Sequence, residues 1–160
     1  MLQRGITVVG YNVQASVDAK NKLITHFDTG SVNDTNALAP VALAVKELLK
    51  LERMDVLADK GYHTGEQIQQ CEQNNITTYV SPKEPASNDP DIFPVTGFKY
   101  NVENNYYICP AGEIMTTNGT WHFHSSKVNG RNIDRSEFAN QVEQNNRRVK
   151  EKPDYYRQRQ

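Results

Sequence analysis

Residues 55–62 read Asp-Val-Leu-Ala-Asp-Lys-Gly-Tyr, and the predicted architecture is built outward from them. The run is short and mostly apolar, it follows a helical segment, and it ends in an acid, which favours a buried strand over 55–58. Gly61 lets the backbone turn sharply into the next segment. An acid at the carboxyl end of a buried strand faces the crevice where open α/β sheets hold ligands. Asp59 is therefore the leading candidate for a functional side chain.

Asp59 has two interpretations from its position alone. A carboxylate there is suited to a hard divalent cation, which prefers oxygen ligands. The more common role of an Asp at a strand end is that of a turn or helix-cap residue. The local sequence leaves both open.

The residues before this strand predict a hairpin and a helix. Apolar and polar residues alternate from Val8 to Val17, which indicates a half-buried strand. A turn-like segment follows, and Leu23 to Phe27 completes an antiparallel hairpin. Apolar residues then recur at helical spacing from about Asp34 to Leu51, with Pro40 tolerable only near the first turn.

The residues after the strand predict a second helix and a further strand. Thr64 and Gln67 have the spacing of a capping box for a helix that runs to about Asn74. Residues 76–80 indicate a strand. The order is β-β-α-β-α-β, which predicts an α/β fold with a mixed sheet and helices on its faces.

The pattern changes after residue 83. Four prolines between residues 81 and 94 suit neither a helix nor a central strand, so residues 84–130 are predicted to form a Pro-rich linker and a small β-rich insertion. The Asn118-Gly119 pair predicts a hairpin turn there. A C-terminal helix is expected from Asp134 to Lys152, with Asp134 and Glu137 as a possible capping box and Pro153 at its end. We therefore divide the chain into residues 1–83, 84–130 and 131–160.

Composition bounds the class of protein. The chain has 160 residues, a net charge of −1 and 37% hydrophobic residues, which fits roughly one domain with a modest core. Cys71 and Cys109 form no CxxC pair, so a disulfide framework is not indicated and a reducing cytoplasm suits them. No apolar run is long enough for a membrane span.

The last fourteen residues are basic. Six Lys/Arg against two Asp/Glu give the segment from Arg147 to Gln160 a charge of +4, within a chain that is otherwise mildly acidic. Such a tail permits contact with phosphate, although a run of this kind is more often a solvated helix face. The candidate DNA-binding side chains are those of Arg147, Arg148, Lys150, Tyr155, Arg157 and Arg159.

Several short motifs, in order, resemble the middle of DDE transposases of bacterial insertion sequences. They are Gly10-Tyr11-Asn12-Val13-Gln14, Val17-Asp18-Ala19, Asn33-Asp34 and Leu57-Ala58-Asp59-Lys60-Gly61-Tyr62. The resemblance is strongest from Gly5 to Lys83, and it returns more loosely at Tyr107 to Gly112 and at Asn129 to Gln160. It implies an RNase H-like core with a small β-rich insertion.

The resemblance also implies a mechanism. Three acids hold two metal ions, usually Mg²⁺ (or Mn²⁺), which activate water or a DNA 3′-hydroxyl and stabilise the leaving oxygen. Asp59 matches the second acid, as both catalytic residue and metal ligand. The first would lie on a strand before residue 1 and the third, a Glu, just past Gln160. The chain alone is thus expected to be an inactive fragment that binds no metal stably.

Three other sets of residues were weighed for catalysis or metal binding. Asp18 lies in the predicted hairpin turn and Asp34 is a natural N-cap, and neither matches a catalytic position in the family. His122 and His124 with Cys109 lack paired zinc-ligand spacing.

The sequence leaves more than one function open. The first is part of a transposase that cleaves and joins DNA; the second is a non-enzymatic remnant, or a fragment that binds DNA or assembles with full-length transposase or with itself. A third, an unrelated β-rich binding module, is disfavoured by the ordered motifs. The first two place the chain in the bacterial cytoplasm, with DNA as partner and no membrane.

Overall fold

The computed structural model describes residues 2–3, 6–7, 11–29, 33–83, 93–117, 122–124 and 132–157. Contacts divide the chain into two compact units, Met1–Lys83 with Asn140–Gln160, and Glu84–Ala139. The second unit thus includes residues 131–139, which the sequence-based division assigned to the C-terminal part. The start of the predicted first strand at residues 8–10 and the predicted turn at Asn118-Gly119 lie outside the described residues. Residues 11–13 are described and are not in a strand, so the strand predicted from Val8 to Val17 is observed only over Gln14–Val17.

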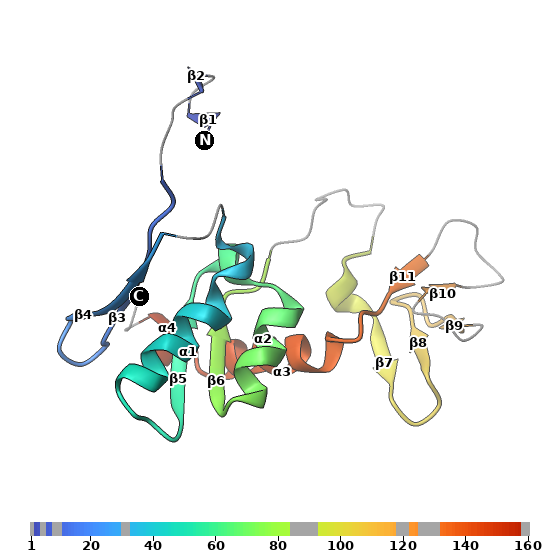
Figure 1. Cartoon of the computed structure of the whole chain (residues 1–160). Coiled ribbons are helices and arrows are strands. Elements are labelled where there is room, and N and C mark those ends of the chain that lie inside the picture. The colour runs from blue at the N-terminus through green and yellow to red at the C-terminus, as the bar shows by residue number, and fades with distance from the viewer. Residues whose placement is uncertain are drawn as a thin grey trace. The chain divides into compact units, whose positions relative to one another are not determined.

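The first unit has the predicted order of elements (Figure 1). The hairpin of β3 (Gln14–Val17) and β4 (Ile24–Asp28) precedes α1 (Leu38–Leu48), β5 (Met54–Ala58), α2 (Gly65–Gln73) and β6 (Ile76–Val80). Two short strands, β1 (Leu2–Gln3) and β2 (Ile6–Thr7), pair with each other before the hairpin. The predicted strand is confirmed as β5, although it ends at Ala58, one residue before Asp59. The helices on either side of it are confirmed, but α1 begins at Leu38 rather than at about Asp34.

The strands of this unit do not form one sheet within the described residues. β3 and β4 make an antiparallel pair with a register shift between Ser16 and Val17, and β5 and β6 make a parallel pair. The predicted continuous mixed sheet is therefore present only as two separate halves.

The core of the first unit lies between α1 and α2 and the parallel pair. Its buried members come from α1, α2 and β6, and partly buried side chains of β5 pack against them; the buried residues are Leu38, Ala39, Ala42, Ile68, Cys71, Ile76 and Val80. On α1 the apolar positions recur every three or four residues, which directs one face of the helix into this core. Pro40 lies in the first turn, where its missing N–H costs no helical hydrogen bond.

The predicted capping box at Thr64 is wrong. Thr64 is the N-cap residue of α2, but its side chain makes no capping hydrogen bond. Gln67 turns instead toward α1, where its Oε1 accepts a hydrogen bond from the Ala39 N–H at 3.0 Å. Because the first N–H groups of a helix have no partner within it, Gln67 satisfies α1 rather than its own helix.

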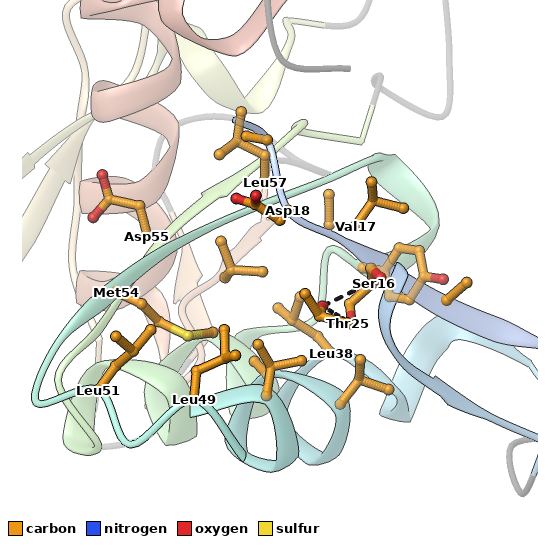
Figure 2. Close-up of a pocket in the computed structure, with 18 of the residues that line it drawn as sticks. Ser16, Val17, Asp18, Thr25, Leu38, Leu49, Leu51, Met54, Asp55 and Leu57 are labelled. Carbon is orange, nitrogen blue, oxygen red and sulfur yellow. Dashed lines mark hydrogen bonds between the residues drawn. The ribbon is translucent and has the colours of Figure 1, made fainter. Parts of the chain in front are cut away.

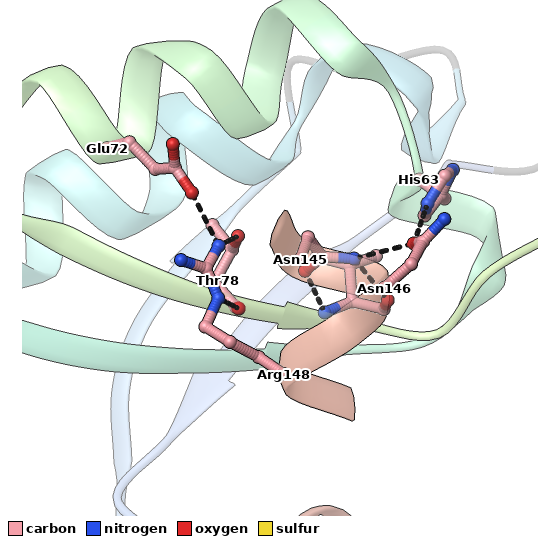
Figure 3. Close-up of polar contacts among 7 residues, drawn as sticks. His63, Glu72, Thr78, Asn145, Asn146 and Arg148 are labelled. Carbon is pink, nitrogen blue, oxygen red and sulfur yellow. Dashed lines mark hydrogen bonds and ion pairs between the residues drawn. The ribbon is translucent and has the colours of Figure 1, made fainter. Parts of the chain in front are cut away.

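A C-terminal helix, α3 (Ala139–Glu151), covers the outer edge of β6 (Figure 3). The Asn145 side chain accepts from the Val80 N–H and donates to the Val80 carbonyl, both at 2.8 Å. Arg148 donates to the Thr78 carbonyl at 3.1 Å and pairs with Glu72. Side chains thus replace a neighbouring strand on this edge.

The ends of the C-terminal helix differ from the prediction. Asp134 lies in strand β11 (Asn132–Asp134), and α3 begins only at Ala139, so Asp134 is not the N-cap residue of this helix and the predicted capping box is wrong. Pro153 follows the end of α3 as predicted, but it also begins a short helix, α4 (Pro153–Arg157), because proline is accepted at the first helical position.

The second unit is a set of short strands around an aromatic core. A turn of 3₁₀-helix, Val95–Gly97, precedes β7 (Lys99–Asn101), β8 (Tyr106–Ile108) and β9 (Ile114–Met115), which pair in sequence; β10 (His122–His124) pairs with β11. The buried residues are Tyr107, Cys109, Met115, Phe123 and Ile133. The Arg135 guanidinium lies 3.8 Å from the centre of the Tyr100 ring and donates to the Tyr107 hydroxyl at 2.8 Å. The predicted β-rich character of this part is confirmed.

Candidate functional site

Asp59 lies at the carboxyl end of β5, as predicted, and its side chain is exposed. It is the N-cap of a 3₁₀ turn, η2 (Lys60–Tyr62), and its Oδ1 accepts a hydrogen bond from the Gly61 N–H at 2.8 Å. The structure therefore gives Asp59 the local turn role that its position suggested. It also presents the carboxylate at the strand end where ligands bind in α/β folds.

Residues from three separate sequence motifs meet beside Asp59. Asp34, in the 3₁₀ turn η1 (Asp34–Asn36), accepts from the side-chain amides of Asn12 at 3.1 Å and Gln14 at 2.9 Å. The Tyr62 hydroxyl donates to Oε1 of Gln14. We call these four residues, Asn12, Gln14, Asp34 and Tyr62, the polar network. Sequence reasoning missed the network, although its members stand inside the motifs that carry the resemblance.

The prediction that Asp34 is an N-cap is wrong. Asn33 holds that place, and its Oδ1 accepts from the Thr35 N–H at 3.1 Å. Asp34 is one residue further on, where its carboxylate meets the two amides of the network. Asp18 does have the predicted turn role, since it accepts from the backbone N–H groups of Lys20 and Asn21.

Hydrogen bonds and burial shift three acid–base equilibria in this region. The amides of Asn12 and then Gln14 lower the pKa of Asp34, because they stabilise its charged form. Burial raises the pKa of Tyr62, and the charges of Asp34 and Asp59 raise it further, so its hydroxyl stays protonated and donates. The backbone N–H of Asn21, followed by that of Lys20, lowers the pKa of Asp18.

A groove runs between β3, α1 and β5 (Figure 2). Its volume is about 860 Å³, and the residues that line it include Gln14, Tyr62, Leu51 and Arg53. Ser16 and Thr25 are bonded to each other on one wall at 2.9 Å. On the side of β5 that faces β6, the Met54 N–H donates to the Asn75 carbonyl and the Ala58 carbonyl accepts from the Ser81 N–H. Because backbone groups alternate in direction along a strand, the N–H and carbonyl groups of Asp55 and Leu57 point to the opposite side, toward the groove.

The C-terminal helix α4 is attached to the same strand. The Tyr156 hydroxyl donates to the Ala58 carbonyl at 2.9 Å, one residue before Asp59. The Tyr155 hydroxyl donates to Asp55 at 2.8 Å, and its ring packs against that of Tyr79. The end of the described chain is thus held at the strand that carries the candidate acid.

The predicted DNA-contacting residues have different surroundings. Arg147 and Lys150 are exposed on α3, where Arg147 lies 4.0 Å from Glu151, and Arg157 is exposed on α4. Arg148 is engaged with Glu72 and Thr78, and Tyr155 with Asp55. Arg159 lies outside the described residues.

The three residues considered as zinc ligands from the sequence all belong to the second unit. His122 and His124 are exposed on β10, Cys109 is buried, and His122 contacts Asp134 at 2.5 Å. Over the described part of the chain, no three His, Cys, Asp or Glu side chains gather closely enough to hold a metal ion. Nor does any described helix have the length and hydrophobicity needed to cross a membrane.

The fold and the strand-end acid define a mixed α/β domain whose candidate ligand-binding side is the carboxyl end of a parallel strand pair. The family model described as "Transposase DDE domain" matches residues 4–160, so the chain belongs to the DDE transposase family. Searches of curated proteins and of solved structures give no match, so the assignment rests on the family model.

Proposed function

We propose that this chain is the part of an insertion-sequence transposase that carries the second of three catalytic acids, Asp59. Its reaction is metal-dependent cleavage and joining of DNA phosphodiesters in the bacterial cytoplasm. The observation that carries the proposal is the position of Asp59 at the carboxyl end of β5, in a chain that belongs to a DDE family. Gly61 donates a hydrogen bond to that acid, and Tyr156 donates one to the carbonyl of the preceding residue, Ala58.

Asp59 is chemically suited to be one ligand of a divalent ion. Its carboxylate is exposed and offers oxygen, which Mg²⁺ and Mn²⁺ prefer. When bound, a metal pair supplies an activated nucleophile and stabilises the leaving oxygen, and it needs carboxylates from several elements. We expect Asp59 alone to bind an ion only loosely.

The groove supports the proposal that the first acid comes from a further strand. A strand residue within a packed sheet occupies on the order of 160 Å³, from a rise of about 3.3 Å, a strand separation of about 4.8 Å and a layer spacing of about 10 Å. A groove of about 860 Å³ matches roughly five such residues, the length of β5. A strand there would unite the two half-sheets and end close to Asp59.

The two edges of the parallel pair differ in a way that favours this placement. On β6, the outer edge is occupied by the side chains of Asn145 and Arg148. On β5, the outer edge lines the groove. The attachment of Tyr156 to Ala58 similarly supports a third acid that follows α4 and begins near Asp59.

The proposal predicts that the chain by itself does not cleave DNA but does hold Mn²⁺ weakly at Asp59. In nuclear magnetic resonance spectra, millimolar Mn²⁺ should broaden the Gly61 amide signal in the wild-type chain and not in Asp59→Asn. Asp18→Asn is the matched control and should behave like wild type. Incubation with Mg²⁺ and supercoiled DNA should give no nicking above the Asp59→Asn background; nicking well above it would contradict the fragment hypothesis.

A DNA-binding remnant is the second candidate, and the exposed basic residues of α3 favour it. Arg147 and Lys150 lie on the same helix and can contact phosphates without disturbing the core. Binding to duplex DNA together with no Mn²⁺ effect at Gly61 would select this candidate over the first.

A further inference from the structure

The polar network ties three parts of the first unit together around the turn that holds Asp59. Asn12 and Gln14 come from the start of β3, Asp34 from η1 and Tyr62 from η2. Gln14 is the centre: it is 2% exposed, its amide nitrogen donates to Asp34, and its amide oxygen accepts from Tyr62. Because both the nitrogen and the oxygen of this buried amide are hydrogen-bonded, the Gln14 side chain is held in one orientation. A movement of Gln14 would therefore also move Asp34.

Gly61 brings this network into contact with Asp59. A Cβ atom on Gly61 would lie 3.0 Å from Oδ2 of Asp34 and also 3.0 Å from Oδ1 of Asp59. The carboxylates of Asp34 and Asp59 therefore close on the same glycine, and the space suits glycine because of this close approach. Asp34 uses Oδ1 for the two amides and presents Oδ2 to Gly61.

Each carboxylate accepts from its own donors. The amides of Asn12 and Gln14 donate to Asp34 Oδ1, and the Gly61 N–H donates to Asp59 Oδ1. These bonds fix which oxygen of each carboxylate is bonded, and they leave Asp34 Oδ2 beside Gly61.

We propose that Asp34 is a positioning residue, held by Gln14, that sets the direction of the Asp59 carboxylate through Gly61. The inference rests on the proposed role of Asp59, but it concerns how the acid is oriented rather than what it binds. Asp34 itself touches neither substrate nor metal in this scheme.

The Gly61 amide proton is the probe, because it donates to Asp59 Oδ1 and the temperature dependence of its chemical shift is small while that bond is formed. In the wild-type chain we expect a small temperature dependence of this signal. Gln14→Leu, remote in sequence from Gly61, removes both bonds of the central amide and should increase the temperature dependence. Asp34→Asn keeps an oxygen that accepts from Asn12 and Gln14, and should leave the temperature dependence small.

Ser16→Ala is the matched control, since it removes two other side-chain hydrogen bonds from the same strand, those to the Thr25 hydroxyl and the His26 carbonyl. The amide signals of Ile68 and Val80 report whether the core is intact. Should Gln14→Leu unfold the chain, Tyr62→Phe removes only the hydroxyl that donates to Gln14 and takes its place in the test. An unchanged temperature dependence of the Gly61 signal in the folded variant, or an equal increase in Ser16→Ala, overturns the proposal.

The same spectra separate this inference from the proposed function. An increased temperature dependence of the Gly61 signal in Gln14→Leu, with no effect of Mn²⁺ on wild type, would retain the positioning role and reject the metal role. Broadening by Mn²⁺ that persists unchanged in Gln14→Leu, with an unchanged temperature dependence, would do the reverse.

Discussion

Replacing Asn145 by leucine tests whether side chains of α3 act as a substitute strand on β6. Asn145 is fully buried, and its amide satisfies both the N–H and the carbonyl of Val80 at 2.8 Å. Leucine is of similar size but cannot bond to either group. The change removes both hydrogen bonds to Val80, each with a net value of about 1 kcal/mol, and a longer one to Asn146 Oδ1 at 3.2 Å. It leaves buried backbone groups whose desolvation costs about 1–3 kcal/mol each. Partial relaxation offsets some of this, so we expect a loss of about 2–4 kcal/mol in the free energy of unfolding.

The assay is urea denaturation of the full chain, with amide hydrogen exchange of Val80 as a readout specific to the first unit. Gln144→Leu is the matched control, because Gln144 precedes Asn145 on the same helix and is exposed. An exposed substitution of this kind should change stability by no more than about 0.5 kcal/mol. A loss in Asn145→Leu no larger than that of Gln144→Leu, with Val80 exchange unchanged, would refute the role given to Asn145.

Four further outcomes follow from the structure. Gln67→Ala should cost about 1 kcal/mol in urea denaturation, the usual value of a helix cap, and Thr64→Ala clearly less; the reverse order would restore the capping box. The pKa of Asp34 is lower in the folded chain than in the unfolded chain, so its ionisation stabilises the fold above the unfolded pKa. This stabilisation is lost as pH falls through the folded pKa, so acid unfolding monitored below about pH 4 should depend less steeply on pH in Asp34→Asn. Burial, with a smaller effect of the Glu72 charge, raises the pKa of Cys71 to about 12, so iodoacetamide at pH 8 should label this thiol only after denaturant is added, and rapid native labelling would contradict the packing. Arg147→Gln with Lys150→Gln should weaken low-salt DNA binding in a mobility-shift assay, whereas Arg148→Gln should mainly lower stability; equal losses of DNA binding would show that Arg148 also contacts phosphate.

The sequence predicted elements whose periodicity reflects one local environment. The strand before Asp59 and the helix after Asn33 have patterns that burial on one side produces directly. The hairpin was also predictable, because alternation and turn residues are local signals.

Features that depend on distant partners were missed or misassigned. Gln67 has the spacing of a capping box, but its amide bonds to Ala39 of α1, 28 residues earlier in the chain. A pattern of neighbouring residues cannot predict a partner at that separation. Asp134 has the residue type and spacing of a helix start, but it lies in a strand that pairs with β10. That pairing depends on residues 122–124, which a local pattern around Asp134 does not include. The polar network could not be predicted for the same reason, because Gln14 and Tyr62 are 48 positions apart in the sequence.

The sequence anticipated the candidate acid and not its surroundings. Asp59 could be chosen because a strand, an acid and a glycine turn follow one another within a few residues. Asp34 was assigned a cap role because residue type and position fit one. The close approach of its carboxylate to Gly61 shows that it lies beside the glycine that donates to the candidate acid.

The central claim, that Asp59 is a catalytic acid of a DDE transposase, is tested most directly by strand transfer in a protein extended through the reading frame on both sides of this chain. With Mg²⁺ and DNA that carries the element's terminal repeats, we expect the extended protein to cleave and join strands. Asp59→Asn should abolish both steps, and Asp18→Asn should leave them intact. Full activity of the Asp59→Asn protein would contradict the account.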